Sequence, residues 1–258
     1  MGDRNHFYHR IRRASCVAGM MRIGSQWPLW IPVAAVMLLA SCSGQITGAV
    51  QTNEQGEFII EAELAPASAR LLAPLSPSAA QSMPVLDAGV ISRSLKDAPG
   101  VAAAQMRNTS PENIVGSIGF SKISDFLMAG EFRFITWEQG PASGRAVIAI
   151  DRSKGPQMIA LLSQDVADYL SAVMAPIATG ELLSKTEYLR LVTSVYGAAI
   201  AREIENAEIT ASIGFPGHIT MAQGGDFSGS TARFRAKLLD LLVLEQPLGY
   251  EVRWTPFR

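Results

Sequence analysis

Cysteine and histidine are scarce in this chain, which has two cysteines and three histidines among 258 residues. Zinc sites need three or four His, Cys or carboxylate ligands, and none cluster at ligand spacing here. A Ser-His-Asp relay needs a histidine together with a nucleophile motif, and no such motif is present. The sequence therefore predicts no metal site, no cofactor and no enzymatic activity.

Charge is also sparse, at 17% of the residues. The first 41 residues hold five Arg and one Asp, which leaves 17 basic and 22 acidic residues, a net charge near −5, in the remainder. A mildly acidic surface lacks the basic patch that nucleic-acid binding needs, and anionic lipid head groups repel it weakly. Attachment to a membrane must therefore come from an anchor rather than from a basic patch.

The longest uncharged apolar run, residues 27–40, is fourteen residues long. A transmembrane helix needs about twenty apolar residues, whereas the core of a signal peptide needs about seven to fifteen. Arginines ahead of this run include Arg10, Arg12, Arg13 and Arg22. Residues 1–41 are thus predicted to be a signal peptide that is removed, with Met1, Met20 or Met21 as the true start.

Leu39, Ala40, Ser41 and Cys42 follow the apolar core. They resemble the lipobox of bacterial lipoproteins. The resemblance implies a diacylglyceryl thioether on the Cys42 sulfur, with chains such as palmitate, cleavage between Ser41 and Cys42, and acylation of the new amine. Each buried CH₂ contributes about 0.8 kcal/mol, so two or three acyl chains hold firmly where one binds marginally. The alternative is a buried helix that ends in an incidental cysteine.

The expected mature protein has no intramolecular disulfide, because Cys16 lies in the leader and Cys42 carries lipid. Residues 42–44 are expected to form the lipidated N-terminus and a short tether, and residues 45–258 a single domain. We expect the protein to be exported and lipid-anchored to the bacterial cell membrane or outer membrane, on the periplasmic or surface side.

Strands and helices are predicted in alternating groups along the mature chain. Period-two alternation is clearest in residues 57–64, where Phe58, Ile60 and Ala62 alternate with glutamates. The expected strands are residues 45–52, 57–64, 101–107, 114–120, 132–137, 145–150, 207–215, 217–222, 231–237 and 250–254, and the expected helices are 85–95, 121–127, 158–173 and 181–206. This order predicts an α+β fold, a largely antiparallel sheet packed against a long helical hairpin.

The tail carries a Pro-Gly turn in residues 215–219 (FPGHI), a Gly-rich hairpin in residues 224–229 (GGDFSG) and an aromatic strand that ends in Trp254. Together with the hairpin after Cys42, which ends in Leu64-Ala65-Pro66, these motifs resemble the LppM-like domain of bacterial lipoproteins. The resemblance implies a clam-like fold with a groove between sheet and helices, and binding of hydrophobic or lipidic molecules.

Aromatic side chains on the predicted strands are the candidate ligand-binding residues. Phe132, Phe134, Trp137 and Trp254 could line an apolar site. Strand aromatics are core residues in most proteins, so packing in the core is the alternative.

Candidate catalytic and cation-binding residues have simpler structural explanations. His218, the one histidine outside the leader, fits a turn position, and Asp165 and Asp168 fit a solvated helix face better than an acid-base pair. Glu57, Glu61 and Glu63 could bind a cation but fit an exposed strand face.

Two functions follow from these observations. The first is a non-catalytic membrane-anchored lipoprotein of the cell envelope that binds a lipid or another hydrophobic ligand. The alternative is a structural or assembly lipoprotein that docks to an envelope protein complex, with no partner that the sequence identifies.

Overall fold

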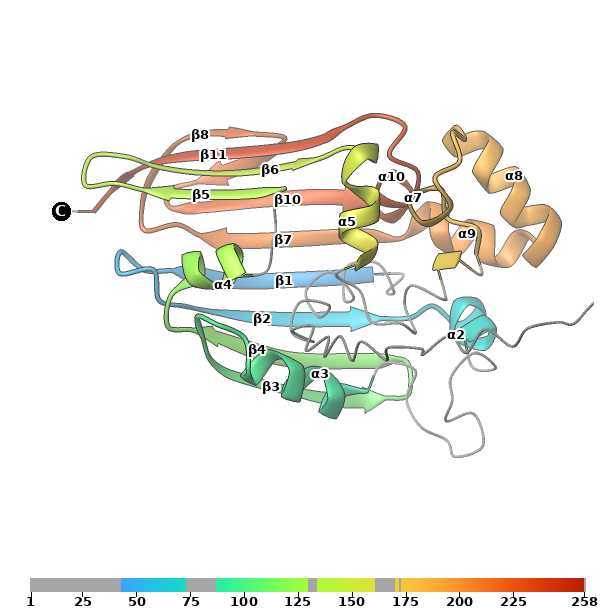
Figure 1. Ribbon diagram of the computed structural model, residues 1–258, viewed down its shortest axis with the longest axis horizontal. Helices are drawn as coiled ribbons and strands as arrows, with labels where there is room; N and C mark the ends of the chain where they lie inside the picture. The colour runs from blue at the N-terminus through green and yellow to red at the C-terminus, as the bar shows by residue number, and fades with distance from the viewer. Residues whose placement is uncertain (1–42, 73–86, 130–133, 161–169, 172, 258) are drawn as a thin grey trace, which may run out of the picture.

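The protein, seen in a computed structural model, folds into two mostly antiparallel sheets with several short helices (Figure 1). The structure describes residues 43–72, 87–129, 134–160, 170–171 and 173–257. None of the helices in these segments is long and apolar enough to cross a membrane. The predicted α+β class is confirmed.

The larger sheet, sheet A, has the strand order β3-β4-β2-β1-β7-β10-β9. Its strands are β1 (Ser43–Val50), β2 (Gly56–Glu63), β3 (Val101–Ser110), β4 (Asn113–Phe120), β7 (Glu208–Gly214), β9 (Gly225–Ser228) and β10 (Thr231–Lys237). All neighbours are antiparallel except β1 and β7, which run parallel. The predicted alternation of β2 is confirmed, with Phe58, Ile60 and Ala62 buried and the glutamates exposed.

A second sheet, sheet B, was not predicted. It contains β5 (Ile135–Gln139), β6 (Gly144–Ile150), β8 (Gly217–Gln223) and β11 (Leu248–Pro256), in the order β5-β6-β11-β8. The chain passes from β8 of sheet B to β9 of sheet A at Gly224, whose φ of 79° favours glycine. The predicted single sheet is therefore wrong, because the tail strands divide between two sheets at this turn.

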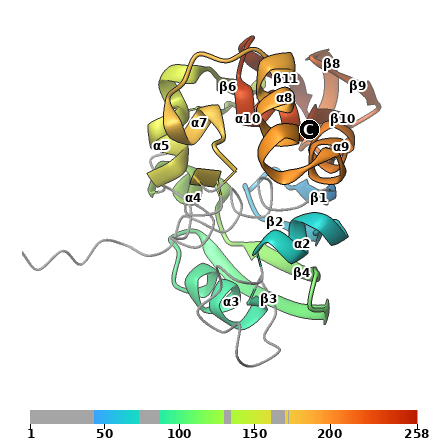
Figure 2. The same ribbon diagram turned by 90° about the vertical axis from the view of Figure 1, so that its right-hand side faces the viewer.

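The two sheets pack face to face over β7 and β10. Phe215, Ile219, Ala232, Val252 and Trp254 form the buried cluster between them. The rest of the inner face of sheet A is covered by helices, and a larger core there includes Ile60, Leu95, Ile118, Tyr188, Ile204 and Leu242. Figure 2 shows α3, α4, α5 and α7 together on this side of sheet A.

Helix α3 is shorter than predicted, and α4 keeps the predicted seven residues but begins two positions later. The helices are α2 (Pro66–Leu72), α3 (Ala88–Lys96), α4 (Ile123–Ala129), α5 (Gly155–Ala160), α7 (Pro176–Thr179), α8 (Lys185–Tyr196), α9 (Ala198–Asn206) and α10 (Leu238–Val243), with a 3₁₀ turn at Arg152–Lys154. Asp87 caps α3 through its side chain, and Ser184 and Glu187 form a capping box that starts α8.

The long helical hairpin is not found in the described part of the chain. Its predicted second arm, residues 181–206, begins only at Lys185 and is interrupted at Gly197. Gly197 has φ 90° and ψ 164°, a conformation outside the helical region, so the arm becomes two helices, α8 and α9. Most of the predicted first arm, residues 161–169 and 172, lies outside the described residues.

Candidate functional site

The predicted lipidation site borders directly on sheet A. Ser41 and Cys42 lie outside the described residues, and Ser43, the next residue, is the first residue of β1. Ser43 and Gly44, which were predicted to be tether, already pair with β2 and β7. Anything attached to Cys42 is therefore one residue away from a strand in the interior of the sheet.

The end of the molecule at which β1 starts is built from α2, α8 and α9 (Figure 1). Glu63 of β2 and Glu208 of β7 are the register partners of Ser43, and α2 follows β2 while α9 precedes β7. The C-terminal end of β11 lies at the opposite end of the molecule. Figure 2 looks onto the β1-start end, where α9 and α2 are neighbours.

A shallow, largely open cleft of about 430 Å³ lies along α9 and reaches Ala65, the residue before α2; we call it the α2–α9 cleft. Its lining residues are Ala65, Ala199, Arg202, Glu203, Asn206 and Ala207. Ligand pockets in proteins have volumes of about 300–1,000 Å³, so the cleft is large enough for part of a small molecule. Alanine methyl groups give it apolar walls, and Arg202 and Asn206 supply exposed hydrogen-bond donors.

Glu203 joins α9 to α2. One carboxylate oxygen, Oε1, accepts a hydrogen bond from the Ala67 N–H at 2.9 Å. The other, Oε2, accepts from the Ser68 N–H at 2.8 Å and from the Ser68 hydroxyl at 2.9 Å. Pro66 begins α2, so this carboxylate satisfies backbone donors that the first turn leaves without intrahelical partners. The Glu203 carboxylate thus links α9 to the first turn of α2, beside the cleft.

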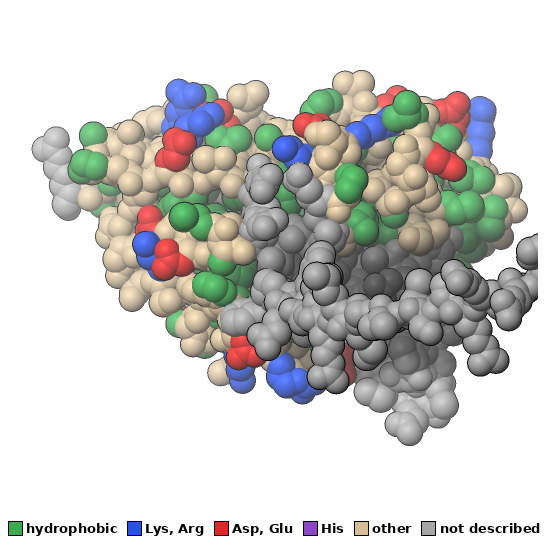
Figure 3. Space-filling view, in the orientation of Figure 1, with side chains coloured by type: hydrophobic (Ala, Val, Ile, Leu, Met, Phe, Trp, Pro, Cys, Tyr) green, Lys and Arg blue, Asp and Glu red, His purple; other side chains and the backbone are tan. Residues whose placement is uncertain are grey.

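Exposed apolar side chains accompany the helices of this end. Val195 on α8 is 53% exposed, and Leu182, just before α8, is 80% exposed. Figure 3 shows hydrophobic side chains grouped at the right-hand end of the molecule, the end at which Figure 1 places α8 and α9. Apolar side chains of this kind insert favourably at a membrane interface.

The predicted ligand-binding aromatics are divided between separate places. Trp254 is 1% exposed and packs with Trp137 and Phe215 between the two sheets, at ring-centroid distances of 4.9 and 5.0 Å. Phe134 is buried in the larger core beneath the helices, and Phe132 lies outside the described residues. The structure therefore does not gather these residues into one cleft, and it packs the two tryptophans against each other.

Three polar atoms in the inter-sheet region have no hydrogen-bond partner among the described residues: Trp137 Nε1, Trp254 Nε1 and Gln139 Oε1. The amide nitrogen of Gln139 donates to the Thr52 carbonyl at 2.6 Å, which ties β5 to the β1–β2 turn. Gln139 and Trp254 lie in one row of sheet B, because both are register partners of Gly144, whereas Trp137 lies two residues away along β5.

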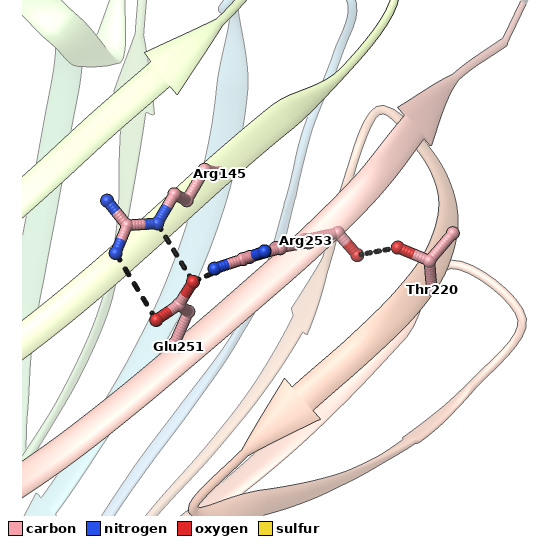
Figure 4. Close-up of polar contacts among 4 residues, drawn as sticks. All are labelled: Arg145, Thr220, Glu251 and Arg253. Carbon is pink, nitrogen blue, oxygen red and sulfur yellow. Dashed lines mark hydrogen bonds and ion pairs between the residues drawn. The ribbon is translucent and has the colours of Figure 1, made fainter.

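The exposed face of sheet B carries an ion-pair network (Figure 4). Arg145 bonds both oxygens of Glu251, with Nε–Oε1 at 2.8 Å and Nη2–Oε2 at 3.3 Å, and Arg253 Nε lies 2.7 Å from Oε1. The bonds from Arg145 and then from Arg253 hold the pKa of Glu251 at about 2. Thr220 donates to the Arg253 carbonyl at 3.2 Å. The carboxylate therefore links β6 to β11, and the Thr220 bond links β11 to β8.

The remaining candidates are not brought together. His218 is exposed and meets the Phe257 ring edge-on at 4.9 Å. It pairs with Thr255 near the C-terminal end of β11, at the opposite end of the molecule from the α2–α9 cleft (Figure 1). Glu57, Glu61 and Glu63 are exposed on β2, and Asp165 and Asp168 lie outside the described residues. Across the described segments, no three His, Cys, Asp or Glu side chains meet as a metal-binding group.

Comparison with known proteins gives one weak structural similarity. No protein-family model and no curated protein matches the chain. The folded domain of LppM from Mycobacterium tuberculosis, solved by NMR, is similar to it with a TM-score of 0.40 and 9% identity, over 84% of this chain and 90% of that domain. A similarity at this level carries no conclusion about ligand or partner.

Sequence reasoning missed the α2–α9 cleft. Ala65, Ala199 and Ala207 are small residues without a distinguishing pattern, and Glu203 is typical of an exposed helix position. The one available signal was the position of the residues in the chain. Ala65 follows β2 and Ala207 precedes β7, and β2 and β7 are the two neighbours of β1.

Proposed function

We propose that this protein is a non-catalytic lipoprotein of the bacterial envelope, anchored through Cys42, that binds a lipid or another hydrophobic ligand in the α2–α9 cleft. One observation carries the proposal: β1 begins one residue after Cys42, and the cleft lies at the same end of sheet A. An acyl anchor on Cys42 would hold this end against the bilayer.

The short distance to the anchor favours a ligand taken from the membrane. A strand rises about 3.3 Å per residue, and Cys42 is followed directly by the first residue of β1, which leaves only a few ångströms for movement away from the head groups. The exposed Leu182 and Val195 side chains at this end add apolar contact with the interface. A lipid could then enter the cleft without crossing bulk water.

The lining of the cleft fits an amphiphile. Alanine methyl groups can contact an acyl chain, while Arg202 and Asn206 can donate hydrogen bonds to a phosphate or carboxylate head group. Both oxygens of Glu203 are already engaged with α2, so this carboxylate is a poor competitor for the arginine. The ligand class supported best is an anionic lipid.

The anchor is tested by labelling cells with a clickable fatty acid. The full chain should take up label, and Cys42→Ser should abolish both the label and membrane association. Absence of label on the parent chain would remove the anchor from the proposal.

The cleft is tested by filling it. Ala199→Trp places an indole in the cleft, whereas Ala198→Trp changes the neighbouring exposed residue on the same helix, which is not among the lining residues. Native mass spectrometry of the protein purified from its own cells should show bound lipid in the parent and in Ala198→Trp, and about a tenfold loss in Ala199→Trp. Equal occupancy in the two variants, or no bound amphiphile in the parent, would rule out the cleft as the binding site.

A further inference from the structure

Sheet A has one face that the described residues leave uncovered. The side chains of Ser43, Gln45, Thr47 and Ala49 on β1 are exposed, as are those of Glu57, Ile59, Glu61 and Glu63 on β2 and of Arg233, Arg235 and Lys237 on β10. These residues are register partners of one another through β1 and β7, and register partners point to the same face of a sheet, so all these side chains lie on one face. We refer to it as the open face.

Most of the charge on the open face of β1, β2, β7 and β10 is divided into two stripes, with Glu208 on β7 between them. Asp226 on β9 is the register partner of Arg233, and Arg107 lies on β3 beyond the acidic stripe. Glu57, Glu61 and Glu63 form an acidic stripe on β2, and Arg233, Arg235 and Lys237 form a basic stripe on β10. Strands β1 and β7 separate them, a distance of about 14 Å at 4.8 Å per strand. Lys237 pairs with Glu208 at 3.4 Å, whereas the three glutamates and both arginines have no ion-pair partner among the described residues.

We propose that the open face binds the open face of a second copy of this chain, with a two-fold axis that runs parallel to the strands between β1 and β7. Rotation about this axis exchanges β1 with β7 and β2 with β10. The acidic stripe of each copy then lies over the basic stripe of the other, as an isologous interface requires.

The register of the strands brings opposite charges to the same level. Glu61 is linked through Gln45 and Thr210 to Arg235, and Glu63 through Ser43 and Glu208 to Lys237. Rotation about an axis parallel to the strands does not change a residue's level along them. Glu61 therefore opposes Arg235 of the second copy, and Ile59, which is 49% exposed, opposes the aliphatic stem of Arg233.

Strand directions agree with this symmetry. β1 and β7 run parallel to each other, and β2 and β10 each run antiparallel to them. Stacked sheets cross at about 30°. At β2 and β10, about 7 Å from the axis, this crossing shifts opposing residues of the two copies by about 4 Å relative to each other along the strands. Arginine and glutamate side chains are long enough to span this offset.

The size of the open face suits a dimer. Extended to the neighbouring β4 and β9, the face has five strands of about seven residues and one of four, at 4.8 Å per strand and 3.3 Å per residue. This gives about 600 Å² per copy, or about 1,200 Å² in total, at the lower end of the range of stable interfaces. Thr47, Ala49, Ser212 and Gly214 at its centre are small and permit close approach. Both copies also begin β1 at the same end, so two anchors could enter one bilayer, a point that rests on the proposed function.

The first test uses the absence of other thiols. If Cys42 carries lipid, an introduced cysteine is the only free thiol in the mature chain. Thr47→Cys lies near the proposed axis, and Thr136→Cys, on the exposed face of β5, is the matched control. A bismaleimide spanning about 10 Å, the separation of stacked sheets, should crosslink Thr47→Cys to itself in isolated membranes at least about fivefold more than Thr136→Cys.

The second test exchanges the charges. Arg235→Glu alone should lower the Thr47→Cys crosslink at least about fivefold, because it places a carboxylate opposite Glu61 of the second copy. Adding Glu61→Arg restores an opposite pair and should bring the crosslink back to at least half its original yield. Circular dichroism checks that every variant is folded.

Three outcomes would overturn the dimer: equal crosslinking of Thr47→Cys and Thr136→Cys, crosslinking of Thr47→Cys to a different protein, or no recovery in the exchanged variant. The parent chain is included because a crosslink from it would reveal an unmodified Cys42. Failure of the anchor is thereby distinguished from failure of the dimer.

Discussion

Gly144 is predicted to be essential for the packing of Trp254. A Cβ atom at residue 144 would lie 2.0 Å from Trp254 Cε2 and 2.2 Å from Cζ2, both far inside van der Waals contact. The indole cannot move aside easily, because Trp254 is 1% exposed and packs against Trp137 and Phe215. Gly144→Ala should therefore displace the indole of Trp254, its neighbour in sheet B, from its packing between the two sheets.

The expected cost follows from overpacking. Separating the new methyl group from the indole requires a shift of more than 1 Å, and such overpacking costs about 2–3 kcal/mol. A domain of about 200 residues loses about 2–4 °C of Tm per kcal/mol, so the expected decrease in Tm is about 5–10 °C. If Trp254 is first replaced by Leu, the same alanine should cost less than about 1 kcal/mol, because the clash is removed.

Thermal and urea unfolding followed by circular dichroism measure these differences. Gly249→Ala is the matched control, since Gly249 lies on the same strand as Trp254 and a Cβ there meets nothing within 4 Å. The control should be neutral. Equal stability of Gly144→Ala and Gly249→Ala would refute the packing of Trp254 on Gly144.

Three further predictions concern hydrogen bonds. The folded pKa of Glu251, about 2, is below its ordinary value of 4.5, so its stabilising contribution is complete above about pH 4.5 and is lost as the pH falls through 2. Urea unfolding should therefore show Glu251→Gln to be less stable than the parent at pH 7, with the difference vanishing near pH 2; a difference independent of pH would contradict this. Glu203→Ala should cost about 2 kcal/mol, because it removes the carboxylate that accepts from the Ala67 N–H and from the N–H and hydroxyl of Ser68. The exposed Glu205→Ala should change urea stability by less than about 0.5 kcal/mol. Ser184→Ala should cost about 1 kcal/mol through loss of the capping box, with Ser194→Ala, exposed on the same helix, as the control; equal effects of the two would argue against the cap.

Local patterns in the sequence predicted local structure well. The alternation of residues 57–64 reports which side of β2 is buried, since successive strand side chains point to opposite faces. The hairpins β1–β2, β3–β4 and β5–β6 follow from short polar loops between such segments. These features depend on residues that are close together in the chain.

The choice of partners between distant strands could not be predicted from the sequence. β1 pairs with β7 although Ser43 and Glu208 are 165 positions apart, and nothing in either segment encodes that choice. Gly197 was missed for a different reason, because apolar residues keep helical spacing on both sides of it while its backbone leaves the helix. The α2–α9 cleft depends on both effects, since it forms only after β2 and β7 are placed on either side of β1.

The position of β1 also determines how the molecule bears tension. Its hydrogen bonds to β2 extend over Ser43–Val50, and those to β7 extend over residues 43–49. A pull applied just before Ser43 acts along the strand, at right angles to both ladders, so many bonds must break together instead of one at a time as in a peeled edge strand. The fold is therefore built to resist extraction by mechanical force at its N-terminal end.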